Sequence, residues 1–197
     1  MNDAILKVGR QLLNTMSVEA DALRHWHTML RGYALTDRPH EAASWLACVL
    51  ALESVIEGNF GVGAVLLDEA GVVVESGHNQ VFHPYFRSDR HAEMVVLERW
   101  EESRRAAGKL TLVTSLEPCP MCLVRLSCSH VLDIFHVAVD EIGGMVSRLQ
   151  TLPPYWLSIA EGKNFAFADC SDALRTASLE IVRLNLDLLT GEVTARR

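Results

Sequence analysis

Apolar residues recur along the chain with two different spacings, and the spacing separates predicted helices from predicted strands. Over residues 41–56 the apolar positions form a wide face at helical spacing, and they do so again over residues 171–189. Residues 62–67 and 72–74 are instead continuous apolar runs, separated by the turn sequence D-E-A-G at 68–71. We expect these two runs to form a β-hairpin whose strands are covered on both faces.

The middle and end of the chain continue to alternate between helical and extended patterns. The further predicted elements are a helix at 91–106, a strand at 110–113, a helix that starts at Cys119 and includes Val131, and strands at 132–139 and 164–168. Residues 152–156 are interpreted as a rigid turn, because two prolines precede two aromatic residues. This order of elements predicts an α/β fold, with a sheet covered by helices on both sides.

The first 40 residues give the weakest pattern, and we interpret them as a helical extension ahead of one domain at 41–197. Apolar residues at helical spacing over 5–13 predict an amphipathic helix. A second helix is expected to begin near Ser17. The extension is longer than the predicted domain needs, and its role stays open.

Composition and charge limit the classes of function. The 197 residues are 49% hydrophobic, which is enough for one domain with a full core. The net charge of −7 argues against a long polyanionic partner, because nucleic-acid-binding proteins usually carry a basic patch. The longest apolar run, 45–52, is shorter than the roughly 20 residues of a membrane helix, and no secretion signal is visible at the N-terminus. We therefore expect a soluble cytoplasmic protein without membrane contact.

The five cysteines do not form the framework of a disulfide-rich domain, because their number is odd and their spacing irregular. Cys119 and Cys122 form a C-x-x-C pair, which suits a reducing compartment. Cys48 lies in an apolar run and is interpreted as a small core residue. We interpret Cys128 and Cys170 as structural residues as well.

The candidate metal-binding and catalytic residues lie in two short sequences, H-A-E at 91–93 and P-C-P-M-C at 118–122. Together they offer one imidazole, two thiolates and one further carboxylate. A catalytic zinc ion takes three protein ligands and keeps a fourth position for water, whose pKa the metal lowers toward neutrality. The histidine and the two cysteines would fill the three positions, and Glu93 would remain beside the metal as an acid and base.

The spacing of these residues supports part of this arrangement. Cys119 and Cys122 are three residues apart at the start of a predicted helix, so they face the same way, and the helix N-terminus favours their thiolates. His91 also opens a predicted helix. His91 and Glu93 are two apart, and an ideal helix would not point them in the same direction. For the C-x-x-C pair alone, a redox pair or half of a structural zinc site stays open as an alternative.

The combination of H-A-E, a strand and S-L-E-P-C-P-M-C resembles the cytidine deaminase-like superfamily, whose signature is H-x-E followed by P-C-x-x-C. The resemblance covers roughly residues 43–189 and is greatest to the guanine deaminase and tRNA adenosine deaminase branch. It implies a three-layer α/β/α fold with a central mixed sheet of about five strands and extra N-terminal helices. It also implies Zn²⁺ bound by His91, Cys119 and Cys122, catalysis by Glu93, and a homodimer.

The resemblance implies substrate contacts too. Asn79, at the end of the second predicted strand, matches an asparagine that contacts the substrate in that branch, although a turn-forming role is the alternative. Ala92, beside the zinc-binding histidine, is included in the expected substrate site. Phe86 and Trp156 are included because their rings could stack on a flat heterocycle, and packing within their own segments is the alternative.

We therefore expect hydrolytic deamination of a small aminated heterocycle, with a purine base such as guanine first and a cytosine, cytidine or pterin-like ring second. A tRNA substrate is not expected, because the tail lacks the basic, aromatic last helix of the tRNA enzymes and ends with only Arg196 and Arg197. A catalytically silent zinc-binding interaction module is the alternative of a different class. The presence of Glu93 argues against it.

Overall fold

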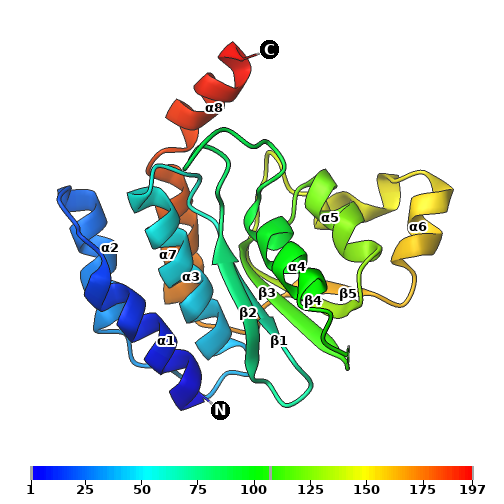
Figure 1. Ribbon diagram of the computed structural model, residues 1–197, viewed down its shortest axis with the longest axis horizontal. Helices are drawn as coiled ribbons and strands as arrows, with labels where there is room; N and C mark the ends of the chain where they lie inside the picture. Colours follow the sequence, from blue (N-terminus) through cyan, green and yellow to red (C-terminus); the bar gives the residue numbers. More distant parts are fainter. Residues whose placement is uncertain (1, 107, 197) are drawn as a thin grey trace.

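The computed structural model describes residues 2–106 and 108–196, whose helices and strands form layers (Figure 1). The strands are β1 (Gly63–Leu67), β2 (Val73–His78), β3 (Leu110–Leu116), β4 (Val131–Ala138) and β5 (Asn164–Phe167). On one side of the sheet lie α1 (Asn2–Thr15), α2 (Asp21–Arg31), α3 (Glu41–Ile56) and α7 (Asp172–Arg183). On the other side lie α4 (Ala92–Glu102) and α5 (Pro120–Ser127), with α6 (Pro154–Ala160) beyond them. The predicted three-layer α/β/α fold with extra N-terminal helices is confirmed.

Within the described residues the five strands form one mixed sheet in the order β2-β1-β3-β4-β5. β1 is antiparallel to both β2 and β3, whereas β3, β4 and β5 are parallel. The predicted hairpin is confirmed, but its second strand continues to His78 instead of ending at Val74. β1 is buried as expected, while β2 is the half-exposed edge strand, so only one of the two strands is covered on both faces.

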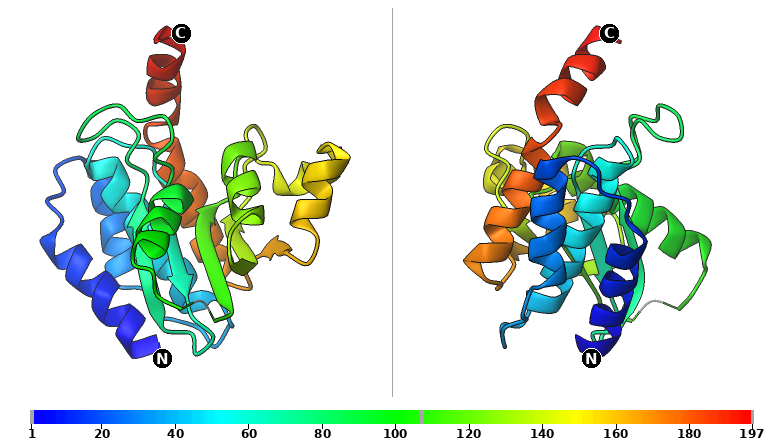
Figure 2. Two further views of the ribbon diagram at one scale, coloured as in Figure 1. Left: turned by 45° about the vertical axis from the view of Figure 1, so that its right-hand side comes forward. Right: turned by 90° about the vertical axis from the view of Figure 1, so that its left-hand side faces the viewer.

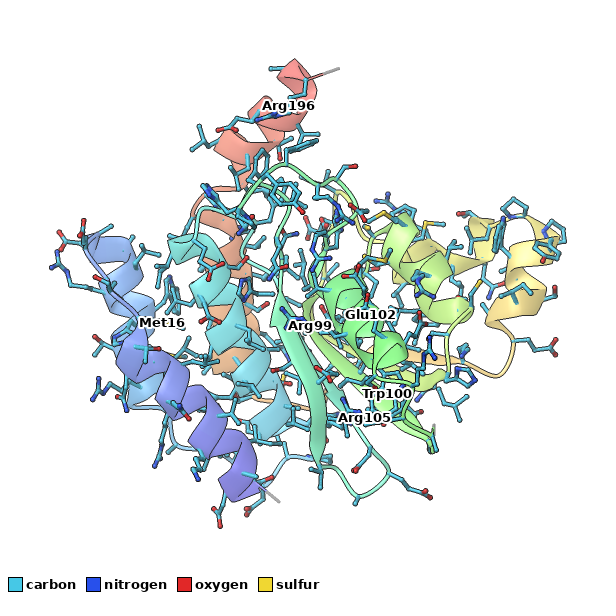
Figure 3. All side chains as sticks on the ribbon, viewed as in Figure 1. Met16, Arg99, Trp100, Glu102, Arg105 and Arg196 are labelled. Atoms are coloured by element: carbon cyan, nitrogen blue, oxygen red, sulfur yellow. The ribbon has the colours of Figure 1, made fainter. Side chains whose placement is uncertain are left out.

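Side chains from α4 and the residues after it cover the outer edge of β2. Arg99 donates to the backbone carbonyl of Ser76 at 3.0 Å, and Arg105 is ion-paired with Glu75. The Arg105 guanidinium also stacks over the Trp100 ring, 4.7 Å from its centroid. Figure 3 shows the labelled Arg99, Trp100 and Arg105 beside this strand. Such cover protects a strand edge from pairing with another chain.

Hydrophobic side chains on the two faces of the sheet build two separate core clusters. Val65 and Val113 pack toward α3 and α7, whereas their neighbours Leu66 and Leu112 pack toward α4 and α5. This alternation follows from strand geometry, in which successive side chains point to opposite faces. Helix α3 is buried nearly all round, because it lies between the sheet and the N-terminal helices. No helix of the described residues is both long and apolar enough to span a membrane.

The N-terminal helices α1 and α2 add an outer layer on α3 (Figure 2). The indole of Trp45 on α3 donates to the backbone carbonyl of Leu30 at 2.9 Å and lies directly against Gly9, where a Cβ atom would collide with the ring. One tryptophan therefore fixes both helices to α3. Helix α2 begins at Asp21, four residues later than predicted. The boundary between extension and domain at residue 40 stays a prediction.

The continuous helix predicted over 171–189 is wrong, because the chain breaks into α7 and α8 (Leu186–Ala195). At the break, Asn185 has a φ of −137°, outside the helical region, and its side chain donates to the backbone carbonyl of Asn59 at 2.7 Å. A tertiary hydrogen bond therefore turns the chain into a second helix. Gly191 lies inside α8 and not after it, and α8 projects from the body of the molecule (Figure 2).

Two other predicted elements differ from the structure. Helix α5 ends at Ser127, so Val131 is the first residue of β4; the hydroxyl of Ser129 accepts the N–H of Val131 at 3.2 Å and closes the turn between them. Residues 152–156 are not a turn but lead into helix α6. Pro153 and Pro154 stand at its start, where a missing N–H costs nothing.

Candidate active site

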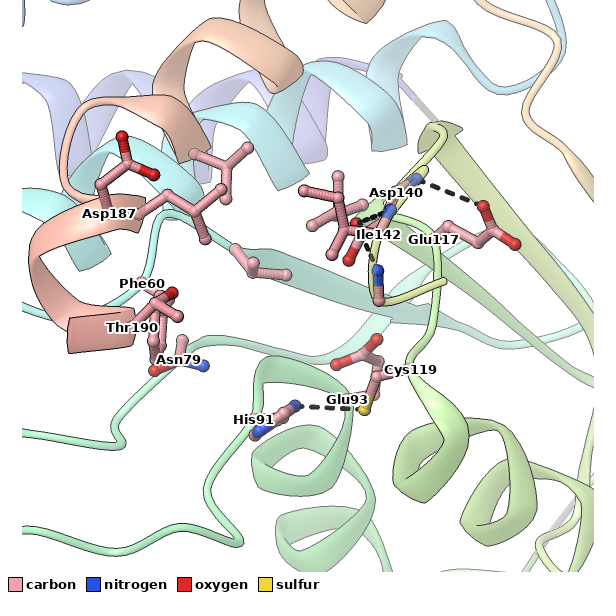
Figure 4. Close-up of a pocket in the computed structure, with 15 residues that line it drawn as sticks. Phe60, Asn79, His91, Glu93, Glu117, Cys119, Asp140, Ile142, Asp187 and Thr190 are labelled. Atoms are coloured by element: carbon pink, nitrogen blue, oxygen red, sulfur yellow. Dashed lines mark hydrogen bonds between the residues drawn. The ribbon is translucent and has the colours of Figure 1, made fainter. Parts of the chain in front are cut away.

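The candidate site lies at the sheet edge where β2, β3 and β4 end. These three strands run in the same direction, because β1 is antiparallel to both β2 and β3. The segments that follow them therefore meet at one edge, the usual place for a ligand site in an α/β sheet. A cavity of about 340 Å³ opens there, lined by these segments and by α8 (Figure 4).

The structure brings His91, Cys119 and Cys122 together at this cavity. His91 immediately precedes α4 and Cys119 immediately precedes α5, and each carbonyl accepts the first hydrogen bond of its helix at 2.9 Å. Nδ1 of His91 is 3.5 Å from Sγ of Cys119. One donor atom from each of the three residues lies within 4.8 Å of the others. Two helix N-termini thus converge on one point and favour negative charge there.

These three donors fit a zinc ion. One imidazole nitrogen and two thiolate sulfurs are preferred zinc ligands, and three protein ligands leave one position open. Interaction with the neighbouring Cys122 thiol is the main cause that lowers the pKa of Cys119 to about 4, and the same interaction together with burial raises the pKa of Cys122. A divalent cation bound between the two sulfurs would hold both as thiolates.

Glu93 lies beside this donor group without belonging to it. Its side chain is buried, with 3% of the residue exposed, and Oε2 accepts from the Cys122 thiol at 3.4 Å. Burial, with a smaller contribution from the charge on Cys119, raises the pKa of Glu93. His91 has an extended backbone, with φ −69° and ψ 159°, so it precedes the helix that holds Glu93. Helical spacing therefore does not separate the two side chains, and both line the cavity.

Asn79 also lines the cavity and is held by three hydrogen bonds. Its N–H donates to the carbonyl of Val62 at 2.9 Å, and its carbonyl accepts from the Ser54 hydroxyl at 3.0 Å. Its side-chain oxygen accepts the N–H of Val81 at 3.0 Å, which is the turn-forming role considered as the alternative. One lone pair of this oxygen is used in the turn, and the amide NH₂ makes no hydrogen bond to another described residue, so the NH₂ can donate to a ligand.

The remaining three predicted contacts do not line the cavity. Phe86 is exposed and lies under the guanidinium of Arg196, 4.6 Å from the ring centroid. Trp156 lies on α6, which packs against α5. Ala92 is fully buried in the core cluster between α4 and the sheet.

Sequence reasoning missed most of the wall opposite the metal group. Asp140 and Ile142 line the cavity from the loop after β4, and Asp187 and Thr190 line it from α8. The loop had a signal, since an acidic residue and two glycines follow a predicted strand. The contribution of α8 had none, because a continuous helix over 171–189 would carry its residues away from the site.

The converging imidazole and thiolates beside a buried carboxylate define a zinc site of the base-deaminase type. The family model of the cytidine and deoxycytidylate deaminase zinc-binding region matches residues 37–138, more than half of the chain. The chain belongs to this family. The matched segment contains Asn79, Glu93 and the three candidate metal ligands.

Two relatives each match about half of the chain. A tRNA-specific adenosine deaminase of Bacillus subtilis (strain 168) is 35% identical over 101 residues, which are 49% of this chain and 60% of that protein. A probable cytosine deaminase of Schizosaccharomyces pombe is 29% identical over 103 residues, which are 52% of this chain and 62% of that protein. The chain thus spans about three fifths of the length of these relatives.

Solved structures share the fold over a longer stretch. A guanine deaminase from Nitrosomonas europaea superposes with a TM-score of 0.58 at 18% identity, covering 86% of this chain and 97% of that one. A tRNA:A34 deaminase superposes with a TM-score of 0.56 at 23% identity, covering 68% of this chain and 94% of that one. At such identities the likeness concerns the fold.

Proposed function

We propose that this protein is a zinc-dependent hydrolytic deaminase that releases ammonia from a small aminated heterocycle. A purine base such as guanine is the first candidate, and a cytosine, cytidine or pterin-like ring is the second. One observation carries the proposal: the buried carboxylate of Glu93 faces the cavity beside a metal group to which it does not belong. A structural metal site has no use for such a carboxylate.

Zinc, when bound, would supply Lewis-acid activation of a water molecule. The carboxylate of Glu93 accepts a proton from the attacking water as its oxygen bonds to the ring carbon that bears the amine. Glu93 then gives this proton to the adjacent ring nitrogen. The second proton of the water goes to the leaving amine through the same carboxylate, the C–N bond breaks and ammonia departs. The raised pKa of Glu93 makes its carboxylate a stronger base for the first of these transfers.

Asn79 supports the orientation of a flat ring in the cavity. Its NH₂ group is free to donate, so the matching edge of the substrate presents an acceptor, such as a carbonyl oxygen or an unprotonated ring nitrogen. Thr190 from α8 adds a hydroxyl to the lining.

The charge of the cavity favours an unphosphorylated substrate. Four acidic residues line it, Glu93, Glu117, Asp140 and Asp187, and the carboxylate of Glu117 is turned toward the loop after β4. Among the described residues of the lining, none is lysine or arginine. The two thiolate ligands would balance the charge of the proposed zinc ion, so a phosphate group would meet no further cation of the lining to offset repulsion by the carboxylates. A base or nucleoside therefore fits better than a nucleotide.

Arginines on the neighbouring loop are already engaged. Arg87 is ion-paired with Asp89 at 2.7 Å, and Arg90 is ion-paired with Glu98 and donates to Gln80 at 3.0 Å. They are not available as free partners for a phosphate backbone unless these pairs break.

A tRNA substrate is the third candidate, favoured by the 35% identity to the tRNA-specific adenosine deaminase of B. subtilis. The net charge of −7 and the acidic lining speak against it. RNA binding would show itself as a steep fall in affinity with salt. A homodimer and a cytoplasmic location belong to the proposal as expectations of the family and of the C-x-x-C thiolates. Sedimentation measurements test the dimer.

Metal analysis combined with an ammonia-release screen tests the proposed function. The screen uses guanine, adenine, cytosine, their nucleosides and monophosphates, pterins and triazines, with a synthetic anticodon stem-loop as a further arm. We expect one zinc per chain and turnover of an unphosphorylated ring. Zinc-loaded protein that releases no ammonia from any of them would favour the silent interaction module, and turnover of the stem-loop alone would establish the tRNA alternative.

A further inference from the structure

The buried carboxylate of Glu117 has no part in the mechanism above, although it stands two residues before Cys119. Only 3% of the residue is exposed. Its carboxylate does not turn toward the metal group but toward the loop after β4, as the labelled Glu117 and Asp140 in Figure 4 show. A buried carboxylate is costly to desolvate, so its hydrogen bonds indicate what it holds.

Both oxygens of Glu117 accept backbone N–H groups of the segment 140–147, which is a loop whose last two residues begin the 3-10 helix η1 (Val146–Thr151). Oε2 accepts from the N–H of Asp140 at 3.2 Å, and Oε1 accepts from the N–H of Ser147 at 2.9 Å. The backbone adds to this attachment, because the N–H of Met145 donates to the carbonyl of Pro118 at 2.9 Å. The carboxylate therefore joins the beginning and the end of the loop over residues 140–147.

Gly144 shows how closely the loop covers this carboxylate. A Cβ atom at Gly144 would lie 2.5 Å from the carboxyl carbon of Glu117 and 2.5 Å from the backbone oxygen of Asp140. Neither neighbour has room to move away, since one is buried and the other is backbone. The loop thus wraps directly over Glu117, and glycine is required for close approach and not for an unusual φ.

The same loop supplies one wall of the cavity, through Asp140, Ile142 and Gly143. We infer that Glu117 is a positioning residue for the substrate: its carboxylate fixes the 140–147 loop to the segment that carries Cys119. Together with the backbone bond from Met145 to Pro118, this side chain then sets the distance between the metal group and this wall. A carboxylate suits the task because it offers only acceptors, whereas a carboxamide would turn its NH₂ toward one of the two backbone N–H groups.

The test replaces Glu117 by glutamine, which keeps size and shape, in zinc-loaded full-length protein. Hydrogen exchange at the amides of Asp140 and Ser147 is expected to accelerate about tenfold or more, the scale of a lost hydrogen bond to a charged group. The zinc content is expected to stay at that of the parent. With a substrate found by the screen, KM is expected to rise about tenfold while kcat changes little, because the wall positions the ring and takes no part in proton transfer.

Glu141→Gln is the matched control, because it makes the same chemical change at an exposed position of the same loop. Gly144→Ala is the second variant. It lifts the loop from the carboxylate while leaving Glu117 intact, and it should reproduce the faster exchange and the higher KM.

Three results would overturn the inference. They are unchanged exchange at both amides, loss of zinc in Glu117→Gln, and a fall in kcat without a rise in KM. The kinetic part of the inference rests on the proposed deaminase activity, but the exchange measurement does not. Faster exchange at both amides in Glu117→Gln, in a zinc-loaded protein that turns over no compound of the screen, would therefore refute the proposed function and leave the attachment of the loop by Glu117 standing.

Discussion

His91 and Cys119 reach the cavity from the position just before a helix, whereas Asp140 and Asp187 reach it from a loop and from a helix more than 40 residues apart in sequence. The metal-binding half of the site is therefore built from two short motifs. In each motif the start of a helix fixes the positions of the side chains. The substrate-facing half is assembled from segments that meet only in the folded chain. Chemistry is thus encoded locally, and specificity depends on tertiary contacts.

The largest effect is expected from removing a metal ligand. Cys119→Ser should lose zinc and with it all measurable turnover, because a serine hydroxyl does not ionise to replace the thiolate. Metal content after dialysis and ammonia release measure the two effects. Cys128→Ser is the matched control, since Cys128 is exposed at the end of the same helix. Full zinc occupancy in Cys119→Ser would show that the metal-binding half is not built as described.

Next in size is the loss of the acid and base. Glu93→Ala should keep its zinc and lose turnover by about 10²–10⁴-fold, the usual contribution of positioned proton transfer. The exposed Glu102, on the same helix, gives the control variant Glu102→Ala. Turnover of Glu93→Ala at the parental rate would remove Glu93 from the mechanism.

A smaller effect is expected in the substrate-facing half. Asn185→Ala removes the hydrogen bond to the carbonyl of Asn59 that sets the direction of α8. We expect a loss of about 1 kcal/mol in the free energy of unfolding. KM should rise while the zinc content stays constant, because α8 carries Asp187 and Thr190 into the cavity. The surface variant Asn164→Ala serves as control. If Asn185→Ala and Asn164→Ala had the same KM, α8 would have no role in substrate binding.

The smallest effect concerns the pH dependence of stability at the end of β2. Burial lowers the pKa of His78, but hydrogen bonds and charges from Glu53 and Glu57 outweigh it, so the net pKa is raised. Because the pKa of His78 is higher in the folded than in the unfolded state, protonation of His78 stabilises the fold. This stabilisation is fully present below the unfolded-state pKa of about 6.5 and is lost as the pH rises through the folded-state pKa. The free energy of unfolding, measured with denaturant, should therefore decline from about pH 6 to about pH 9, and this decline should be smaller in His78→Gln. The exposed His130→Gln should leave the decline unchanged.

The elements predicted from the sequence differ from the structure mainly where a contact from another part of the chain decides. The hairpin β1–β2, helix α3 and strands β3 to β5 follow from apolar spacing, because burial against a sheet imposes that spacing directly. The continuous helix predicted over 171–189 was wrong. The chain bends at Asn185, whose side chain donates to the carbonyl of Asn59, 126 residues away in the sequence. The spacing of apolar residues within 171–189 therefore could not predict this contact with Asn59.

The candidate site divides in the same way. The sequence by itself determined the metal donors and the acid beside them, because two helix starts carry the imidazole, the thiolates and the carboxylate within spans of three to five residues. Only the tertiary structure decided which side chains face them. It placed Phe86 and Trp156 outside the cavity lining, and brought in Asp140 and Asp187. The physical reason is that a helix N-terminus positions the residues of its own short motif. The cavity wall depends instead on the strand order, on the bend before α8 and on the attachment of the 140–147 loop to the carboxylate of Glu117.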